Sequence, residues 1–268
     1  MSRPEGSVAP GPGNPAGRGG SGDPKGSPRW DRPRSVGSRG GAPVNREGAG
    51  PGGRPGDALL AAGLAAAYAA FALTFRGPRR AFWDRMTATG LALGGLALTT
   101  EPELRRTSIR GRDVAAGLAS AAGLYAVFLA GDRVVRRLLP GGGREIADIY
   151  ALQELRPRGE LAARLALVIG PAEELFWRGF VNRRLGRRFG SWPGAALGSA
   201  AYGGAHVATG NVTLFGAAGV AGAYWSALAA AGMPVSALIV SHTAWDLLTF
   251  LVAPTTPSEG TTPGVPRA

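Results

Sequence analysis

The residues that could carry chemistry in this chain are carboxylates and imidazoles that lie within otherwise apolar sequence. Both histidines of the 268-residue chain fall between Phe189 and Ser258, a stretch in which Asp246 is the only charged residue. A charged side chain at mid-bilayer costs at least about 2.5 kcal/mol, so it indicates a functional site that faces the interior of a helix bundle. Because the chain has no cysteine, any hydrolysis must use carboxylates, imidazoles, hydroxyls or a metal that these hold.

The first motif contains two adjacent carboxylates and one arginine. Arg178 lies one helical turn beyond Glu174 and is near enough to neutralise it. Glu173 points about 100° away from Glu174 on the same helix. We therefore predict that Glu174 is an ion-paired structural carboxylate and that Glu173 faces a cavity as a general base, although the two roles could be exchanged.

Two further motifs each place a pair of side chains one turn apart. Tyr202 precedes His206 by four residues, and His242 precedes Asp246 by the same spacing, so each pair lies on one helix face. The three motifs together predict one converging site. Its predicted catalytic residues are Glu173, Glu174, His206, His242 and Asp246, with Arg178 and Tyr202 as supporting residues.

These residue types are suited to hydrolysis, and the sequence leaves two versions open. In one, Glu173 and His206 activate a water molecule while His242 and Asp246 stabilise the oxyanion. In the other, His206, His242 and a carboxylate such as Glu173 bind zinc, and the remaining glutamate is the base. The cofactor is therefore zinc or none.

The elements that must position these residues are membrane-spanning helices. The apolar blocks are continuous and rich in alanine, which favours helices over the alternating strands of a membrane barrel. We predict an all-α, polytopic transmembrane bundle of about seven spans. The predicted spans are Ala58–Phe75, Met86–Thr100, Val114–Gly131, Leu161–Leu185, Pro193–Ala208, Val212–Ala231 and Pro234–Val252.

The composition divides the chain into five parts. Residues 1–56 are rich in Gly, Pro, Ser and Arg and are predicted to be a disordered basic tail. Residues 57–131 hold three transmembrane helices, and residues 132–160 form a polar connection with a short amphipathic helix around Ile146–Leu155. Residues 161–253 form the catalytic bundle, and residues 254–268 form a flexible C-terminal tail.

The net charge of +12 does not indicate a nucleic-acid partner, because the arginines lie in the tail and between apolar blocks instead of on one face. We interpret them as topology signals. Arg183, Arg184, Arg187 and Arg188 place the end of the fourth span, and with it the N-terminal tail, in the cytoplasm. Arg76, Arg79, Arg80 and Arg85 then fall on the opposite side, against the rule.

The three motifs, in this order, resemble those of the CPBP intramembrane proteases, the CAAX-protease and bacteriocin-processing group also called Abi. The resemblance covers about Leu161–Leu251. It implies a helical bundle with a buried site open toward the cytoplasmic leaflet, and an endopeptidase in which Glu173 is the base. It differs at two positions: Tyr202 stands where Phe is commoner, and Asp246 where Asn is commoner.

The resemblance implies a membrane-embedded or lipid-linked peptide or protein as substrate. The Gly- and Ala-rich composition without cysteine favours a bacterial plasma-membrane protein, in which bacteriocin maturation, self-immunity or membrane-protein processing fits better than cleavage of prenylated substrates. Two other classes stay open on the same residues: a proton- or cation-coupled transporter, since buried Glu, His and Asp also form ion pathways, and a non-catalytic membrane scaffold.

Overall fold

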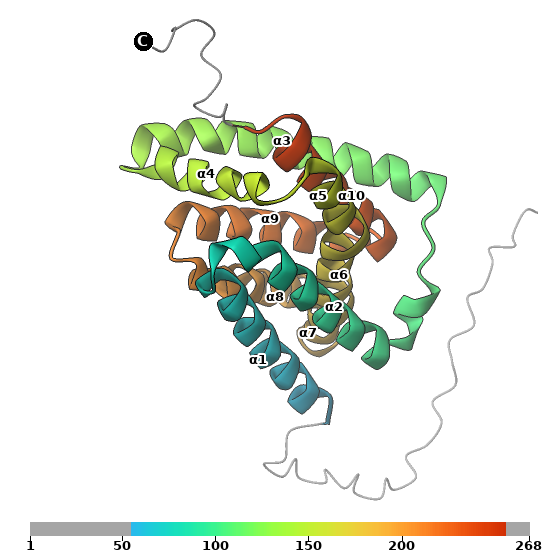
Figure 1. The fold of residues 1–268 in the computed structure, drawn as a ribbon. Coiled ribbons are helices and arrows are strands. Elements are labelled where there is room, and N and C mark those ends of the chain that lie inside the picture. Colours follow the sequence, from blue (N-terminus) through green and yellow to red (C-terminus); the bar gives the residue numbers. More distant parts are fainter. Residues whose placement is uncertain (1–54, 256–268) are drawn as a thin grey trace, which may run out of the picture. The chain divides into compact units, whose positions relative to one another are not determined.

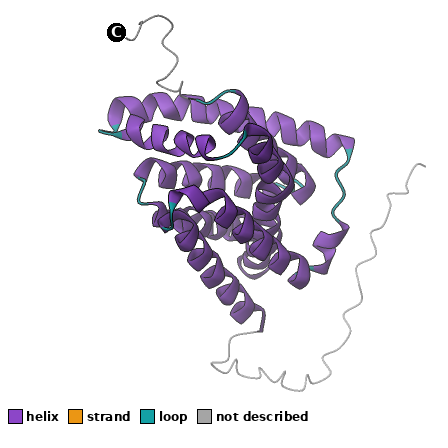
Figure 2. Cartoon of the chain, viewed as in Figure 1, coloured by secondary structure: helices purple, strands orange, loops and turns teal. Residues whose placement is uncertain are grey.

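The computed structural model describes residues 55–255, and every regular element in this range is a helix (Figure 2). The predicted all-α class is therefore confirmed. The predicted tails at 1–56 and 254–268 lie almost entirely outside the described residues. The α-helices are α1 Pro55–Arg76, α2 Phe82–Thr100, α3 Gly111–Leu138, α4 Gly142–Tyr150, α5 Arg158–Arg164, α6 Gly170–Glu174, α7 Arg183–Phe189, α8 Ser191–Ala205, α9 Val212–Ala230 and α10 Val235–Leu247.

Four helical stretches within residues 55–255 are long and apolar enough to cross a membrane. They are Gly56–Arg76, Gly111–Leu138, Val212–Ala230 and Val235–Val252. Each coincides with a predicted span, and the protein is therefore a membrane protein with several apolar helices. The second of them, α3, continues well past its predicted end at Gly131, because Asp132 and Arg136 form an ion pair of 2.9 Å one turn apart.

The predicted count of seven spans is not confirmed. The other three predicted segments are helical, but each falls short of a free-standing span. The α2 helix carries Asp84 and Arg85 in its first turn. The α8 helix has 15 residues, which at about 1.5 Å per residue is shorter than the roughly 30 Å hydrocarbon core. The fourth predicted span contains charged residues and is divided into short helical pieces.

The residues from α5 to α7 form one uninterrupted helical segment, which we call the helical path, and two parts of it are π-helical and so have wider turns. Residues Leu165–Ile169 and Leu175–Asn182 are π-helical, and the short α6 lies between them. Pro171 lies in the first turn of α6 and has no backbone N–H to donate, which is compatible with the wide turn that precedes the helix. Both glutamates of the first motif therefore lie in a short α-helical piece between two π-helical segments.

The helices of residues 55–255 pack as a bundle (Figure 1), and glycine allows some of them to approach closely. A Cβ on Gly117 of α3 would lie 2.7 Å from the carbonyl oxygen of Ala237 on α10, and one on Gly222 of α9 would lie 2.8 Å from the Tyr202 ring on α8. Small residues at such contacts let helix backbones pack tightly in membranes. At Gly117, the missing side chain lets α3 lie directly against α10.

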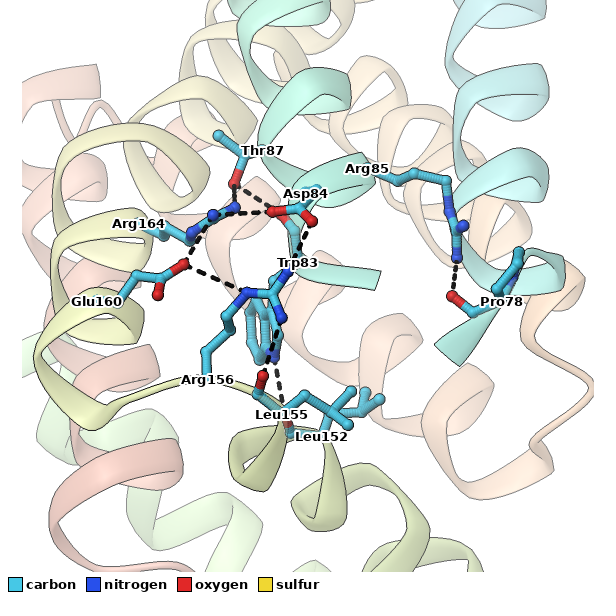
Figure 3. A network of polar contacts seen from close by, with 10 residues as sticks. All are labelled: Pro78, Trp83, Asp84, Arg85, Thr87, Leu152, Leu155, Arg156, Glu160 and Arg164. Carbon is cyan, nitrogen blue, oxygen red and sulfur yellow. Dashed lines mark hydrogen bonds and ion pairs between the residues drawn. The ribbon is translucent and has the colours of Figure 1, made fainter. Parts of the chain in front are cut away.

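Ion pairs join the helices at one end of the bundle, which we call the Asp84 end. Figure 3 shows Arg156 and Arg164 both reaching the Asp84 carboxylate, at 2.7 and 2.8 Å, while Glu160 pairs with the same two arginines. The side-chain hydrogen bond from Arg164 and the charge of Arg156 hold the pKa of Asp84 below its usual range. This network fixes the start of α2 against the start of the path that carries the glutamates.

A second set of ion pairs lies at the opposite end, which we call the Glu101 end. Glu101 is buried and accepts Arg184 and Arg187, each at 2.6 Å, and Arg183 pairs with Glu103 at 2.8 Å. Three of the four arginines that we interpreted as topology signals are thus bound to carboxylates of the segment that follows α2. The helical path from α5 to α7 is therefore anchored by charges at both ends.

The predicted amphipathic helix corresponds to α4 and the turn that follows it, and it contacts α9 through Glu145. The Glu145 carboxylate accepts the backbone N–H of Thr213 at 2.8 Å and its hydroxyl at 2.6 Å, and the N–H of Val212 at 3.4 Å. A carboxylate at the N-terminus of a helix binds its free N–H groups and complements its dipole. Glu145 thereby holds α4 on the start of α9.

Glu145→Gln is expected to lower the thermal unfolding midpoint of the detergent-purified protein at pH 7 by up to about 4 °C. The hydrogen bonds from Thr213 hold the pKa of Glu145 below its usual value of 4.5. Their stabilising effect is therefore complete above pH 4.5 and is lost as the pH falls through the lower folded-state pKa. The exposed Glu154→Gln is the control, and an equal midpoint for both variants at pH 7 would contradict the assignment.

Candidate active site

A buried ion pair lies at the centre of the bundle. The Arg178 guanidinium donates to Glu174 Oε1 at 2.9 Å, and both side chains are fully buried. The pair predicted from the spacing of Glu174 and Arg178 is therefore present. A second guanidinium nitrogen of Arg178 donates to the carbonyl oxygen of Gly222 at 3.3 Å, which connects this segment to α9.

The same glutamate also binds a histidine of another helix. Glu174 Oε1 accepts the ring Nδ1 of His242 at 2.8 Å. An ionised carboxylate only accepts hydrogen bonds, so the proton of this contact is on Nδ1 of the imidazole. The other ring nitrogen, Nε2, faces Asp246 Oδ2 at 3.8 Å. His242 thus lies between two carboxylates, and the predicted convergence of His242 and Asp246 is observed.

Tyr202 connects the remaining two predicted residues. Its hydroxyl donates to Glu173 Oε2 at 3.0 Å, and its carbonyl oxygen accepts Nδ1 of His206 at 2.9 Å. Because a carbonyl oxygen cannot donate, His206 carries its proton on Nδ1, and in the neutral ring Nε2 has a free lone pair. Glu173 Oε1 and His206 Nε2 are therefore the atoms that stay available to a water molecule.

The two halves of the site are joined by aromatic rings around Arg178. Its guanidinium lies 4.8 Å from the centre of the Tyr202 ring and 5.4 Å from that of Trp225. Trp225 in turn stacks on the His242 imidazole, with ring centres 4.0 Å apart and planes inclined by 22°. Arg178 therefore lies between a ring that holds Glu173 and a ring that covers His242.

Trp225 is the residue that the motif analysis missed. Besides stacking on His242, it donates its indole N–H to the Ser241 hydroxyl at 3.0 Å, and that hydroxyl shares a hydrogen bond of 2.9 Å with Ser120 of α3. Its sequence signal is weak, because a tryptophan in an apolar helix equally indicates ordinary packing. A large aromatic within an otherwise Gly- and Ala-rich span is the one feature that could have drawn notice.

All five predicted catalytic residues are buried within the bundle, and none of them points outward. The exposed fraction is 7% for Glu173, 6% for His206 and 0% for Glu174, and it is equally low for His242 and Asp246. The two carboxylates of the first motif thus differ in exposure: Glu174 is fully buried, with both of its hydrogen bonds on Oε1 and none on Oε2 in the described residues, whereas Glu173 keeps a small accessible surface. That Glu173 faces a cavity as the general base stays a prediction.

The zinc site predicted from the sequence would use His206, His242 and a carboxylate such as Glu173. A zinc site takes three or more protein ligands that converge on one point. Among residues 55–255, no group of three or more His, Asp or Glu side chains is arranged in this way. The described residues do not fit a metal ion, and we derive no step through one.

The chemistry open to this arrangement is proton transfer and charge stabilisation. Glu173 and His206 both bind Tyr202, and each has one atom left to accept a hydrogen bond, Oε1 of Glu173 and Nε2 of His206. Together they can hold a water molecule and accept its proton. His242, placed between two carboxylates, can donate a hydrogen bond to a developing negative charge. A water-consuming reaction of a neutral acyl group requires both functions.

Comparison with known proteins gives one match. Residues 160–248, about a third of the chain, match the family described as type II CAAX prenyl endopeptidase Rce1-like. The match begins in α5 and ends just after α10, so it contains all three motifs. No curated protein and no solved structure matches the chain.

Arg178→Met is expected to lower the free energy of unfolding by about 3–5 kcal/mol, because it leaves the ionised Glu174 buried without its guanidinium. The double variant Arg178→Met, Glu174→Gln should regain part of this loss, since it removes the uncompensated charge. Denaturant unfolding in detergent measures both. A double variant no more stable than Arg178→Met would show that the charge is not the source of the loss.

Proposed function

From the Rce1-like family domain formed by residues 160–248, we propose that this chain is an intramembrane endopeptidase that uses a water molecule activated by Glu173 and His206. The domain family is that of CAAX-type membrane proteases, and the described residues contain apolar helices of membrane-spanning length. The observation that carries the proposal is two buried hydrogen-bonded groups. In one, Tyr202 binds both Glu173 and His206, and in the other, Glu174 binds His242.

In the first step, water lies between Glu173 Oε1 and His206 Nε2. Glu173 takes a proton from the water as its oxygen adds to the carbonyl carbon of the scissile peptide, and a tetrahedral oxyanion forms. The hydroxyl of Tyr202 holds the other oxygen of Glu173, which orients the carboxylate toward the water. A positioned general base of this kind contributes roughly 10²–10⁴-fold to the rate.

In the second step, the oxyanion collapses and the C–N bond breaks. Glu173 returns its proton to the departing nitrogen, so that the products are a carboxylic acid and an amine and the water is consumed. His242 in its protonated form donates to the oxyanion through Nε2, while its Nδ1–H stays hydrogen-bonded to Glu174. Trp225 keeps the imidazole plane fixed by stacking on it, and so acts as a positioning residue.

The location of the site limits which substrates can reach it. The catalytic side chains are buried among helices that include apolar spans, so the substrate is a membrane-associated peptide or protein. The arginines of α7 lie at the Glu101 end of the bundle. We place this end at the cytoplasmic face of a bacterial plasma membrane, since short arginine-rich segments stay on that side.

Glu173→Gln and His206→Ala are each expected to reduce cleavage of a peptide library by at least about 10²-fold, because each removes an atom that holds the attacking water. Purified full-length protein in lipid nanodiscs is incubated with the library, and products are identified by mass spectrometry. The exposed Glu154→Gln serves as the matched control and should cleave at the wild-type rate.

Four outcomes contradict the proposal, two of which need the protein reconstituted in vesicles as well. Wild-type protein that cleaves nothing but moves protons or cations into vesicles is a transporter, and one that does neither is a scaffold. Full cleavage by folded Glu173→Gln protein would move the base to another residue. Loss of wild-type cleavage with a chelator, restored by zinc, would replace the carboxylate mechanism by a metal-dependent one.

Asp246→Asn is expected to keep most of the activity, whereas Asp246→Ala loses about 10²–10³-fold. The amide preserves a polar group beside His242 Nε2, 3.8 Å from the present carboxylate oxygen, and alanine does not. Initial rates on one cleaved peptide, together with thermal unfolding of each variant, measure this. If Asp246→Asn is as inactive as the alanine variant, the negative charge itself is required and the family's commoner residue does not serve here.

A further inference from the structure

Two hydroxyl groups from different helices meet beside the site. The hydroxyls of Ser120 on α3 and Ser241 on α10 lie 2.9 Å apart and share a hydrogen bond. Both side chains are buried. A serine within a helix can turn its hydroxyl back to a carbonyl of the preceding turn. The Ser241 hydroxyl instead reaches across the interface between α10 and α3.

The same Ser241 hydroxyl is the acceptor for Trp225. The indole N–H of Trp225 on α9 donates to it at 3.0 Å. An indole N–H can only donate, so the Ser241 oxygen accepts this bond. Ser120, Ser241 and Trp225 therefore form one buried chain of hydrogen bonds that joins α3, α10 and α9.

The ring at the end of this chain lies on His242. The indole of Trp225 and the imidazole have ring centres 4.0 Å apart and planes inclined by 22°. The torsion that turns an indole about its Cβ–Cγ bond has broad minima, so packing and hydrogen bonding select its angle. The bond to Ser241 fixes the edge of the indole that carries Nε1. It thereby fixes the plane on which the imidazole rests.

The neighbouring Trp245 provides a contrast within the same cluster of rings. Its ring meets that of Trp225 nearly at a right angle, with ring centres 5.7 Å apart. The indole N–H of Trp245 is buried and has no hydrogen-bond partner among residues 55–255. Of the two tryptophans, Trp225 is the one whose orientation is set by a hydrogen bond, and it is the one stacked on the imidazole.

A second contact holds Ser120 against α9. The hydroxyl of Tyr224, the residue before Trp225, donates to the carbonyl oxygen of Ser120 at 3.0 Å. Two neighbouring residues of α9 thus reach one residue of α3, the first directly and the second through the α10 hydroxyl. Ser120 lies outside residues 160–248, which match the family. A helix that precedes the matched domain therefore contributes to the surroundings of the imidazole.

We propose that Ser120 is a positioning residue for His242 and that it acts through Ser241 and Trp225. The inference rests on the proposed protease function, in which His242 donates a hydrogen bond to the oxyanion. Such a donor stabilises the transition state only where its N–H points at the developing charge. The bond from Nδ1 to Glu174 restrains the tilt of the imidazole plane only weakly. The stacked indole supplies the missing restraint.

Ordinary helix packing is the alternative role for the Ser120 bond, and Ser236 provides a matched comparison. Ser236 also lies on α10, is buried, and donates to Asp113 of α3 at 2.9 Å. It joins the same two helices through a different hydrogen bond. A purely structural role predicts similar effects of Ser236→Ala and Ser120→Ala on the imidazole. A positioning role predicts an effect of Ser120→Ala alone.

The first test observes the imidazole directly and does not depend on activity. Because the chain has two histidines, full-length protein with isotope-labelled histidine and no histidine tag gives two sets of ring signals in an NMR spectrum. His206→Ala identifies which set belongs to His242. The ring current of the stacked indole shifts the His242 signals, so a change in its tilt moves them. Ser120→Ala should move these signals, and Ser236→Ala should leave them in place.

The second test measures cleavage of one peptide by protein in lipid nanodiscs. Ser120→Ala should lower kcat about fivefold and leave KM unchanged, because the bond affects the oxyanion donor and not substrate binding. Trp225→Phe keeps an aromatic ring but lacks the N–H, so it should lower kcat by a similar factor. Adding Ser120→Ala to the Trp225→Phe protein should then have no further effect, because both act through one chain. Ser236→Ala should cleave at the wild-type rate.

Unmoved His242 signals in folded Ser120→Ala protein would overturn the inference, and so would equal movement in Ser236→Ala. Effects of Ser120→Ala and Trp225→Phe on kcat that multiply would overturn it as well, because the two residues would then act independently. Thermal unfolding verifies that each variant is folded. If Ser120→Ala does not fold, Ser241→Ala removes the same bond and is judged by the same criteria.

The two tests separate this inference from the proposed function. Signals that move as described in a chain whose wild-type form cleaves no peptide would overturn the protease proposal and leave the control of the imidazole by Ser120 standing. Cleavage by the wild-type chain that is unchanged in Ser120→Ala, with unmoved His242 signals, would overturn the inference and leave the protease.

Discussion

The structure depends on one buried group of charges, in which Glu174 accepts both the Arg178 guanidinium and the His242 imidazole. Charges without water are tolerated only when they are paired and hydrogen-bonded, so this group allows few arrangements of its helices. It fixes α10 against the helical path that carries the glutamates. Arg178 extends the constraint to α9 through the carbonyl oxygen of Gly222, and to the rings of Tyr202 and Trp225.

The two neighbouring glutamates illustrate how such a constraint creates a reactive group. Glu174 is inaccessible and accepts Arg178 and His242 on Oε1, while its Oε2 is buried without a partner in the described residues. Glu173 accepts a hydrogen bond from the Tyr202 hydroxyl on Oε2 and is 7% exposed. The carboxylate that stabilises the fold and the carboxylate that can act on water are thus adjacent in sequence but face different partners. Adjacent residues of an α-helix such as α6 point about 100° apart, which sets these two directions.

Charges at the two ends of the bundle hold the short helical pieces that lack the length to span a membrane alone. Asp84 binds two arginines at one end, and Glu101 binds two at the other. Between these ends large apolar side chains such as Phe71, Trp177 and Phe180 fill the core, and glycines such as Gly117 allow helices to approach closely. A short and interrupted helix can therefore present a polar site inside an apolar bundle.

The sequence by itself determined the helical class and four of the spans, and it predicted the residues of the proposed site, because polar groups in apolar sequence and i, i+4 spacing are local properties. It also predicted the Glu174–Arg178 pair, which is formed within one helix. It could not determine the contact between Glu174 and His242, the stacking of Trp225 or its link to Ser120, and it predicted seven spans where four helices have the required length. These features join segments that are distant in the chain, and only the packing of the helices against one another decides them.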